Sequence, residues 1–542
     1  MYQPLPLQWR GVFVRRRNIM KFQNLDTCTA FAQLSSLSPC SVKEALSTER
    51  IGSYTIHTGG DLTYNYASMP VDKEIIKSLQ QLSIEQQLIE KYTELLNGEI
   101  MNPGEKRLVL HQLTRGQVLH DVIAEGENKG AFYQSQLARI QEFSKQVREG
   151  SILGSTGKRF KTVVQIGIGG SDLGPRALYL ALKGWCTSKD IVQLDAKFIS
   201  NVDPDDAEEV IRGLDFETTL FILVSKSGTT LETLTNRDLV IEAIKKSGIE
   251  GIDASKHMIA VTSKTSPLAS SSSVLEAFFI DDYIGGRYSS TSAVGGVILS
   301  LAYGYDIFDQ VLQGAHEVDG LALEKDITKN ASLMDALIGV YLRNVLNLPT
   351  TAILPYSQAL SRFPAHLQQL DMESNGKHVN RDGELLEYAT GPIIFGEPGT
   401  NGQHSFYQLL HQGTDTVPLQ FIGFSNSQYG KDILVEGSTS QTKLNANLVA
   451  QIVAFARGKD DPNTNKQFEG NRYSSLLIGK QLDARALGAL LAHFENKVMF
   501  QGFLWNLNSF DQEGVQLGKV LASKVLDGCQ GDEILKAYVD LF

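Results

Sequence analysis

The chain has 542 residues, of which 42% are hydrophobic and 20% are charged. These proportions exclude an intrinsically disordered protein, and the length predicts about two to four domains. The formal net charge of −11 excludes a general nucleic-acid binder, which would need a basic surface, although a local pocket can still bind a small anion.

The N-terminal stretch, residues 1–19, contains four arginines, no acidic residue and no long apolar run, and Met20 follows it. A secretory signal would need such an apolar run, so we expect a disordered leader or a start codon assigned too far upstream. The four cysteines of the chain form no CxxC pair, and we expect them to be reduced thiols of a cytoplasmic protein.

Residues 73–115 are the first region with helical spacing, on which Leu88, Tyr92 and Leu95 recur. Three later segments each begin with a short apolar strand and continue into a turn rich in Gly, Ser or Thr. They are residues 161–182, 218–244 and 257–268. Because apolar strands alternate with helices, we predict a parallel sheet covered on both faces, with the turns at the strand ends where ligands bind.

The most apolar stretch, residues 293–303, is shorter than the roughly 18 residues that a membrane span needs, so we expect no membrane helix. A helical region follows at 302–347, and the strand candidate 350–357 then suggests a second α/β unit. The C-terminal segment 500–542 is predicted to be helical, with one polar turn near Asp511.

The turn GIGGSDLGP (167–175) is close to two phosphate-binding motifs and matches neither. Asp172 stands where GxGxxG needs its last glycine, and Pro175 and Arg176 replace the Lys-Ser/Thr pair of a P-loop. Binding of a dinucleotide or a nucleoside triphosphate is therefore disfavoured. Glycines followed by a helix N-terminus can still hold a simpler anion.

The turn SKSGTT (225–230) offers four hydroxyl groups and Lys226 directly after a strand. Such a cluster suits a single phosphomonoester, whose oxygens accept hydrogen bonds. The alternative is that Ser, Thr and Gly only cap the following helices, as they commonly do. Two such turns on neighbouring strands favour phosphate binding.

Further candidates are single residues in glycine-rich or turn-rich surroundings. Arg287 follows two glycines in GGRYS, where a substrate could approach backbone and guanidinium together, although a lone arginine is usually a surface residue. His404 lies on a loop that enters a helix, which favours function over the structural role of most histidines. His411 is seven residues away, no HExxH motif or Cys/His cluster occurs, and we expect no metal or other cofactor. Lys519 ends FDQEGVQLGK and carries no signal by itself.

Taken together, these segments resemble the glucose-6-phosphate isomerase (phosphoglucose isomerase) family. Two long motifs carry the resemblance: DYIGGRYSSTSAVGG around Arg287 and GFLWNLNSFDQEGVQLGK at 502–519. The shorter motifs GIGGSDLGP, MESNGK and GEPGTNGQHSFYQLLHQGT agree with it, and EKRLVLHQLTR does so more loosely. The resemblance extends over roughly residues 20–530, in the family's order.

The resemblance implies reversible isomerisation of glucose 6-phosphate to fructose 6-phosphate through an enediolate, in glycolysis and gluconeogenesis. Glu373 would move a proton between C2 and C1, and Arg287 would stabilise the enediolate. His404 and Lys519 would open the sugar ring, and Gln369 would bind substrate beside the base. The phosphate would be held by Gly170, Ser171, Ser225, Lys226, Ser227, Gly228, Thr229 and Thr230.

The resemblance also implies an α/β fold of two sugar-isomerase-type α/β/α sandwich subdomains with parallel-rich sheets, a helical N-terminal segment and a C-terminal helical arm. On this basis we assign residues 20–124 and 301–510 to the large subdomain, 125–300 to the small one and 511–542 to the C-terminal helical segment. Family members are homodimers whose sites take a histidine from the partner subunit. A cytoplasmic enzyme with a sugar phosphate substrate is implied, with neither nucleic acid nor membrane as partner.

The chain departs from the family in two places. SKSGTT lacks the aromatic residue that the more threonine-rich loop of animal forms contains, and Thr291 lies near the position of a usual tryptophan. The hydroxyl groups and Arg287 are kept, so we expect these changes to affect loop packing and affinity rather than the reaction.

The role of Glu373 as a base, which the resemblance implies, has a chemical reason. Removing a proton from carbon beside a carbonyl needs a positioned base and stabilisation of the resulting oxyanion. On a helix through FPAHLQQLDMES, Gln369 and Glu373 share one face, and Gly376 can end the helix. The apolar stripe on another face is Phe363, Leu367 and Leu370.

Two other classes of function would use some of the same features. A non-catalytic sugar-phosphate sensor would need both phosphate turns but has no use for Glu373, Arg287, His404 and Lys519 together. A dinucleotide oxidoreductase is disfavoured by Asp172.

Overall fold

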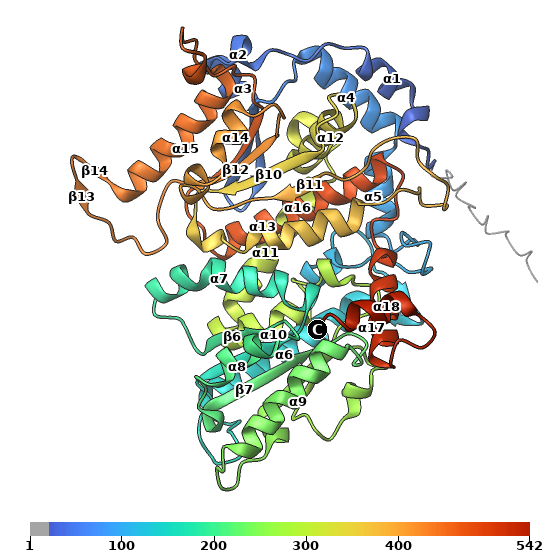
Figure 1. Ribbon diagram of the computed structural model, residues 1–542, viewed down its shortest axis with the longest axis vertical. Helices are drawn as coiled ribbons and strands as arrows, with labels where there is room; N and C mark the ends of the chain where they lie inside the picture. Colours follow the sequence, from blue (N-terminus) through green and yellow to red (C-terminus); the bar gives the residue numbers. More distant parts are fainter. Residues whose placement is uncertain (1–20) are drawn as a thin grey trace, which may run out of the picture.

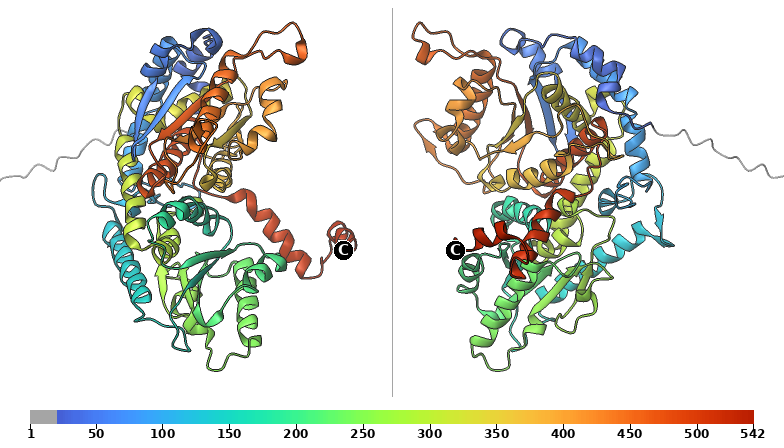
Figure 2. Two further views of the ribbon diagram at one scale, coloured as in Figure 1. Left: turned by 90° about the vertical axis from the view of Figure 1, so that its left-hand side faces the viewer. Right: turned by 45° about the vertical axis from the view of Figure 1, so that its right-hand side comes forward.

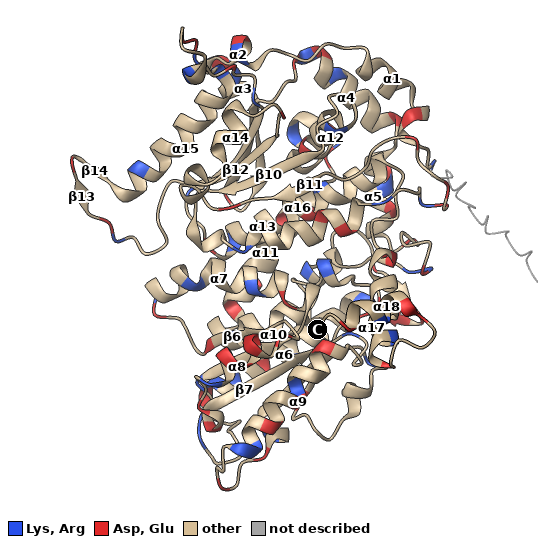
Figure 3. Ribbon diagram, viewed as in Figure 1, with Lys and Arg blue, Asp and Glu red and all other residues tan. Residues whose placement is uncertain are grey.

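The computed structural model of the protein describes residues 21–542 and contains two α/β units stacked along the long axis (Figure 1). The predicted leader, residues 1–19, lies outside the described residues. Basic and acidic residues are interspersed over the face seen in Figure 3. Within residues 21–542, no helix has both the length and the apolar character required to cross a membrane.

The lower unit in Figure 1 is built on a five-stranded parallel sheet in the order β6-β5-β7-β8-β9. Every residue of β7 (Thr219–Val224) is buried. Alternate β7 side chains pack into two separate apolar clusters, because helices cover both faces. The other strands are β5 (Thr162–Ile166), β6 (Asp195–Ile199), β8 (Met258–Thr262) and β9 (Ala277–Phe279).

Helices α8 (Pro204–Ile211) and α9 (Leu231–Lys246) cover one face of this sheet. The opposite face packs against α6 (Lys129–Glu149), α7 (Leu173–Ser188) and α10 (Ala293–Tyr303). All of α10 is buried, which explains why its sequence is the most apolar of the chain. The three strand–turn segments predicted from the sequence are confirmed in this unit.

The upper unit contains a six-stranded sheet in the order β1-β2-β15-β12-β10-β11. Its last four strands are parallel, and the β1–β2 hairpin joins them in antiparallel fashion. The strands are β1 (Thr55–Gly59), β2 (Leu62–Ser68), β10 (Thr350–Pro355), β11 (Ile393–Phe395), β12 (Leu419–Phe424) and β15 (Ser474–Gly479). The predicted second α/β unit is therefore confirmed.

Three helices connect the units and form the centre of the core. In α16 (Ala484–Leu504), every residue except Arg485 is buried, and α11 (Tyr305–Leu321) and α12 (Ala331–Asn344) pack against it. Further helices lie at the periphery of the upper unit. They are α1 (Thr29–Ser35), α2 (Val42–Ala45), α3 (Thr48–Ser53), α14 (Tyr407–Gln412) and α15 (Ser440–Arg457).

The prediction of helix throughout 73–115 was too long. Helix α4 (Lys73–Glu85) ends before Gln87, whose φ of 51° is left-handed, and α5 (Leu88–Leu96) follows. The chain then forms an irregular turn with a β-bridge between Asn102 and Arg107. Pro103 and Gly104 in this turn do not support a helix.

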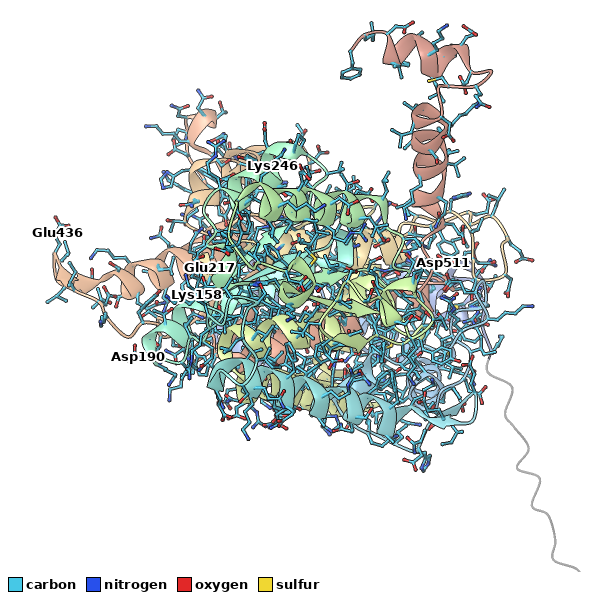
Figure 4. All side chains as sticks on the ribbon, turned by 90° about the horizontal axis from the view of Figure 1, so that it is seen from below. Lys158, Asp190, Glu217, Lys246, Glu436 and Asp511 are labelled. Atoms are coloured by element: carbon cyan, nitrogen blue, oxygen red, sulfur yellow. The ribbon has the colours of Figure 1, made fainter. Side chains whose placement is uncertain are left out.

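The C-terminal prediction also needs correction, because the segment has two breaks instead of one. After α16 the chain is irregular to Gln512, and α17 (Gln516–Leu526) and α18 (Glu533–Val539) are separated by a turn with left-handed Gly528 and Gly531. These two helices form an arm that projects from the body (Figures 2 and 4). Neither helix contains a buried residue.

Candidate active site

A cavity of about 690 Å³ lies where the two units meet. Its floor is formed by the turns that follow β5 and β7. Strand β5 pairs with β6 on one side and β7 on the other, so this is the switch point of the sheet, where open α/β sheets bind ligands. Its other walls come from the loop before Arg287, the segment around Glu373, and α17.

The first turn brings Gly170 and Ser171 to the cavity. A Cβ atom on Gly170 would lie 2.2 Å from the carbonyl carbon of Gly286, so only glycine allows the two loops to meet this closely. Asp172, which breaks the dinucleotide motif, instead accepts a 2.8 Å hydrogen bond from the Nε of Arg176.

The second turn is held by its own hydroxyl groups. The Oγ of Ser225 lies 2.9 Å from the Oγ1 of Thr230 and accepts a hydrogen bond from the backbone N–H of Gly228. Ser227 Oγ accepts bonds from the backbone and side chain of Thr229. Ser225, Lys226, Ser227 and Thr230 line the cavity, whereas Gly228 and Thr229 are not among its lining residues.

The alternative that residues of these turns only cap the following helices does not fit the structure. Thr230 is the N-cap residue of α9 and makes no side-chain cap bond, and the same holds for Asp172 before α7. The backbone N–H groups at both helix starts are therefore not satisfied by a capping side chain, which suits binding of an anion.

The helix that carries Glu373 is not a regular α-helix to its end. Helix α13 (Phe363–Gln368) continues as a π-helical turn, Gln369–Glu373, which we call the π-turn. The predicted apolar stripe of Phe363, Leu367 and Leu370 is buried as expected, and the helix ends before Gly376. Both Gln369 and Glu373 line the cavity.

Glu373 and Arg287 face each other on the cavity wall. The Oε2 of Glu373 is 3.6 Å from an Nη of Arg287, and the side chains are 16% and 2% exposed. Oε2 of Glu373 and Oε1 of Gln369 are buried without a hydrogen-bond partner within the described part of the chain. Two unsatisfied acceptors on one wall indicate a place for ligand hydroxyl groups.

Arg287 is held in place by hydrogen bonds to two other segments of the chain. Its Nε donates to Ser374 Oγ at 2.7 Å, and one Nη donates to the carbonyl oxygens of Ser509 and Asp511 at 2.7 and 2.8 Å. Arg287 is thus a buried, oriented cation, and the alternative of a surface arginine is wrong.

Of the remaining predicted residues, Lys519 lines the cavity from α17, whereas His404 does not. His404 is exposed at the end of a 3₁₀ turn, Asn401–His404. His411 is structural: its ring stacks on Phe455 with centroids 3.8 Å apart and lies 2.8 Å from the Oε1 of Gln451.

Several lining residues were missed from the sequence. Asn102, Glu105 and Arg107 reach the cavity from the irregular turn after α5, and Asp282 and Ser266 flank the second turn. The signals available for the first three were the turn sequence NPGE and the motif EKRLVLHQLTR, which contains Glu105 and Arg107. Within residues 21–542, no group of three or more His, Cys, Asp or Glu side chains is placed to hold a metal ion.

Comparison with known proteins gives one consistent result. The family model for phosphoglucose isomerase matches residues 65–539. The glucose-6-phosphate isomerase of Treponema denticola is 60% identical, covering 94% of this chain and 97% of that protein, and that of Borreliella burgdorferi is 48% identical, covering 96% and 98%. The crystal structure of a glucose-6-phosphate isomerase from Chlamydia trachomatis matches with a TM-score of 0.89 at 44% identity, covering 96% and 99%. The predicted fold class is thereby confirmed.

Proposed function

Since the chain belongs to the phosphoglucose isomerase family, it is an aldose–ketose isomerase of glucose 6-phosphate and fructose 6-phosphate, and we propose that the reaction takes place in the cavity described above. The observation that carries this assignment is that a Glu373 carboxylate oxygen, which accepts no hydrogen bond within the described chain, faces the buried Arg287 guanidinium. Both lie above the two turns that suit a phosphate group.

The phosphate binds at the two turns, where Ser171, Ser225, Ser227 and Thr230 offer hydroxyl groups and two helix N-termini offer backbone N–H groups. This anchors the sugar by its C6 end and leaves C1 and C2 to reach the opposite wall. Gln369 binds a hydroxyl group of the substrate beside the base.

The ring opens first. Lys519 and a His404 supplied by a partner subunit move a proton from the C1 hydroxyl to the ring oxygen, which leaves an open chain with an aldehyde at C1. Glu373 then removes the proton from C2. The electron pair forms the C1–C2 double bond, the carbonyl oxygen on C1 becomes an oxyanion, and Arg287 stabilises its charge.

The product forms when Glu373 returns the same proton to C1. The hydroxyl proton on O2 passes to O1, and C2 becomes the carbonyl carbon of fructose 6-phosphate. No atom is gained or lost in this sequence, so it needs no co-substrate. A coupled assay that detects glucose 6-phosphate formed from fructose 6-phosphate, without added metal or nucleotide in the isomerisation step, tests the assignment. A chain that binds the sugar phosphate without turnover would instead be a sensor.

We also propose a homodimer with shared sites. His404 is exposed and absent from the cavity of its own chain, as expected of a residue that serves a second subunit. The projecting arm exposes apolar side chains that have no cover within the described chain. They are Leu517, Val520, Leu526, Ile534, Tyr538 and Leu541.

A second projection supports the same proposal. The β13–β14 hairpin (Leu434–Val435 and Ser438–Thr439) extends from the upper unit, with Glu436 at its tip (Figure 4), and Ile433 and Leu434 are about 70% exposed. A partner that covers both projections would remove this apolar surface from water. All four cysteines are free, which agrees with our proposal of a cytoplasmic enzyme.

A further inference from the structure

Lys226 lies in the second phosphate turn, but its ammonium group is bonded elsewhere. Its Nζ donates hydrogen bonds to the carbonyl oxygens of Asp282 and Ile284, at 2.9 and 3.1 Å. The Asp282 carboxylate is 3.8 Å away. An ammonium group has three donors, and two of them are used on the backbone of a different loop.

That loop leads to Arg287. We call residues 280–286 the arginine loop, because it connects β9 to the 3₁₀ turn Gly286–Tyr288. The middle of the loop also has a hydrogen bond from the N–H of Leu110 to the carbonyl of Tyr283 at 3.0 Å and one from the N–H of Ile284 to the carbonyl of Asp281 at 3.2 Å. Lys226 therefore supplies two of the contacts that set the path of the chain just before Arg287.

The same loop also touches the first phosphate turn. Gly286 packs directly on Gly170, and just after the loop the Oγ of Ser289 lies 3.5 Å from the carbonyl oxygen of Gly170. Both phosphate turns are thus in contact with the arginine loop, one through a close glycine–glycine approach and the other through Lys226. A phosphate that orders both turns would order the arginine loop as well.

The backbone of Lys226 is itself tied to the sheet. Its carbonyl accepts a hydrogen bond from the N–H of Ser263, next to β8, and Ser225 and Ser227 flank it in the turn. Burial lowers the pKa of Lys226, with Asp282 opposing this effect. The backbone of Lys226 is thus anchored at the sheet, while its partly buried side chain binds the arginine loop. A shift of the phosphate turn would therefore shift the arginine loop.

Building on the function proposed above, we propose that Lys226 is a positioning residue, which couples occupancy of the phosphate site to the placement of Arg287 against Glu373. Its ammonium acts on the arginine loop rather than on the phosphate. Binding energy from the phosphate, which does not react, is thereby used to organise the reacting end of the substrate.

The first test separates turnover from binding. In Lys226→Met, which keeps the length of the side chain but not its donors, we expect kcat to fall about 10- to 100-fold, as for a displaced catalytic group. The dissociation constant of sorbitol 6-phosphate, which has no carbonyl to react, should change less than about threefold. Lys226→Arg can still donate to both carbonyls and should recover most of the turnover. Ser227→Ala, a change in the same turn, should instead weaken the binding of sorbitol 6-phosphate by a larger factor than Lys226→Met does.

The second test needs no turnover. Inorganic phosphate should slow amide hydrogen exchange in 225–230 and in 280–287 of the wild-type protein. In Lys226→Met the protection of 225–230 should remain and that of 280–287 should be clearly smaller, because only the contact between Gly286 and Gly170 is left. If the wild-type protein were inactive, the proposed function would be refuted. The exchange result would still test the coupling, because it does not depend on turnover. Equal protection of 280–287 in both proteins would overturn the coupling. So would a Lys226→Met enzyme with unchanged kcat and about tenfold weaker sorbitol 6-phosphate binding, because the ammonium would then act on the phosphate.

Discussion

At the scale of single residues, the site depends on which side chains are already satisfied before substrate arrives. Arg287 uses two of its three nitrogens on Ser374, Ser509 and Asp511, which leaves the third toward Glu373. The Glu373 oxygen near it has no hydrogen-bond donor within the described chain. A carboxylate oxygen that accepts no hydrogen bond is free to accept a proton from carbon.

Replacing Glu373 by Gln should abolish isomerisation and leave sugar phosphate binding largely intact. The amide keeps the size of the side chain and can still form hydrogen bonds, but it cannot accept the proton. The loss should appear in kcat, measured in the coupled assay, and not in the dissociation constant of sorbitol 6-phosphate. Glu387→Gln, at an exposed position, is the matched control. Retention of even a tenth of the turnover, about 1.4 kcal/mol of barrier, would show that Glu373 is not the base.

Among the groups of the substrate, the hydroxyl groups of Ser225, Ser227 and Thr230 should act mainly on the phosphate. Each bond to a charged group contributes about 1.5–3 kcal/mol, so replacement of one residue by Ala should weaken phosphorylated ligands roughly 10- to 100-fold. Binding of unphosphorylated glucose, already weak, should stay nearly unchanged. Calorimetric titration with both ligands measures the ratio, and an equal loss for both would indicate a structural role in the turn.

At the scale of elements, α13 and the π-turn place Glu373 in the cavity wall, and α13 also carries a buried histidine. His366 lies on α13 against Gly174 of α7, and both of its ring nitrogens are buried without a partner in the described chain. Burial lowers the pKa of His366 to about 4. The folded state therefore keeps this ring neutral where an unfolded chain would protonate it.

This histidine should make the protein less stable in acid. As the pH falls from about 6.5 to about 4, the unfolded state gains a proton that the folded state does not, so the free energy of unfolding falls by up to about 3 kcal/mol. Urea titrations at pH 7.5 and 5 should show a smaller difference for His366→Leu than for the wild type. His378→Leu, at an exposed position, is the control. Identical pH dependence in His366→Leu and the wild type would show that His366 is not a source of the acid sensitivity; buried His111 contributes in the same direction.

The sequence predicted those elements whose pattern is local. The fully apolar β7 and the turns after β5 and β7 were identified because strand, turn and helix succeed each other within about thirty residues. The π-turn was not identified, because the stripe of Phe363, Leu367 and Leu370 fits an α-helix equally well. The cavity wall around Asn102 and the bond from Lys226 to the arginine loop were also missed. Both arise from contacts between segments far apart in the sequence, which no local pattern encodes.

At the scale of the whole molecule, one chain brings the residues proposed to bind phosphate, the proposed base Glu373 and Arg287 to one cavity, which His404 does not line. The arm that carries Lys519 projects beyond the body, and neither of its two helices contains a buried residue (Figure 2). A chain of this shape has a site that a second copy can complete.

Mixing two inactive variants should therefore restore activity. Neither His404→Ala nor Glu373→Gln should be active alone. If they are unfolded and refolded together, about half of the dimers are mixed, and each mixed dimer has one intact site of two, which gives roughly a quarter of full activity. Two residues that serve one site from the same chain could not complement each other in this way. Mixed dimers shown to form, yet no more active than the parents, would refute the shared site while leaving the role of Glu373 untouched.

The π-turn has a consequence for how this enzyme tolerates insertions and deletions. A π-helical turn holds one residue more than the α-helical turn it replaces. Deleting a single residue between Gln369 and Glu373 would therefore convert the π-turn into a regular α-helical turn, and the residues after it would keep nearly the same faces. In a regular α-helix the same deletion would rotate every later residue by about 100°. The extra residue of the π-turn thus lets the chain lose a residue beside Glu373 without displacing the segment that follows.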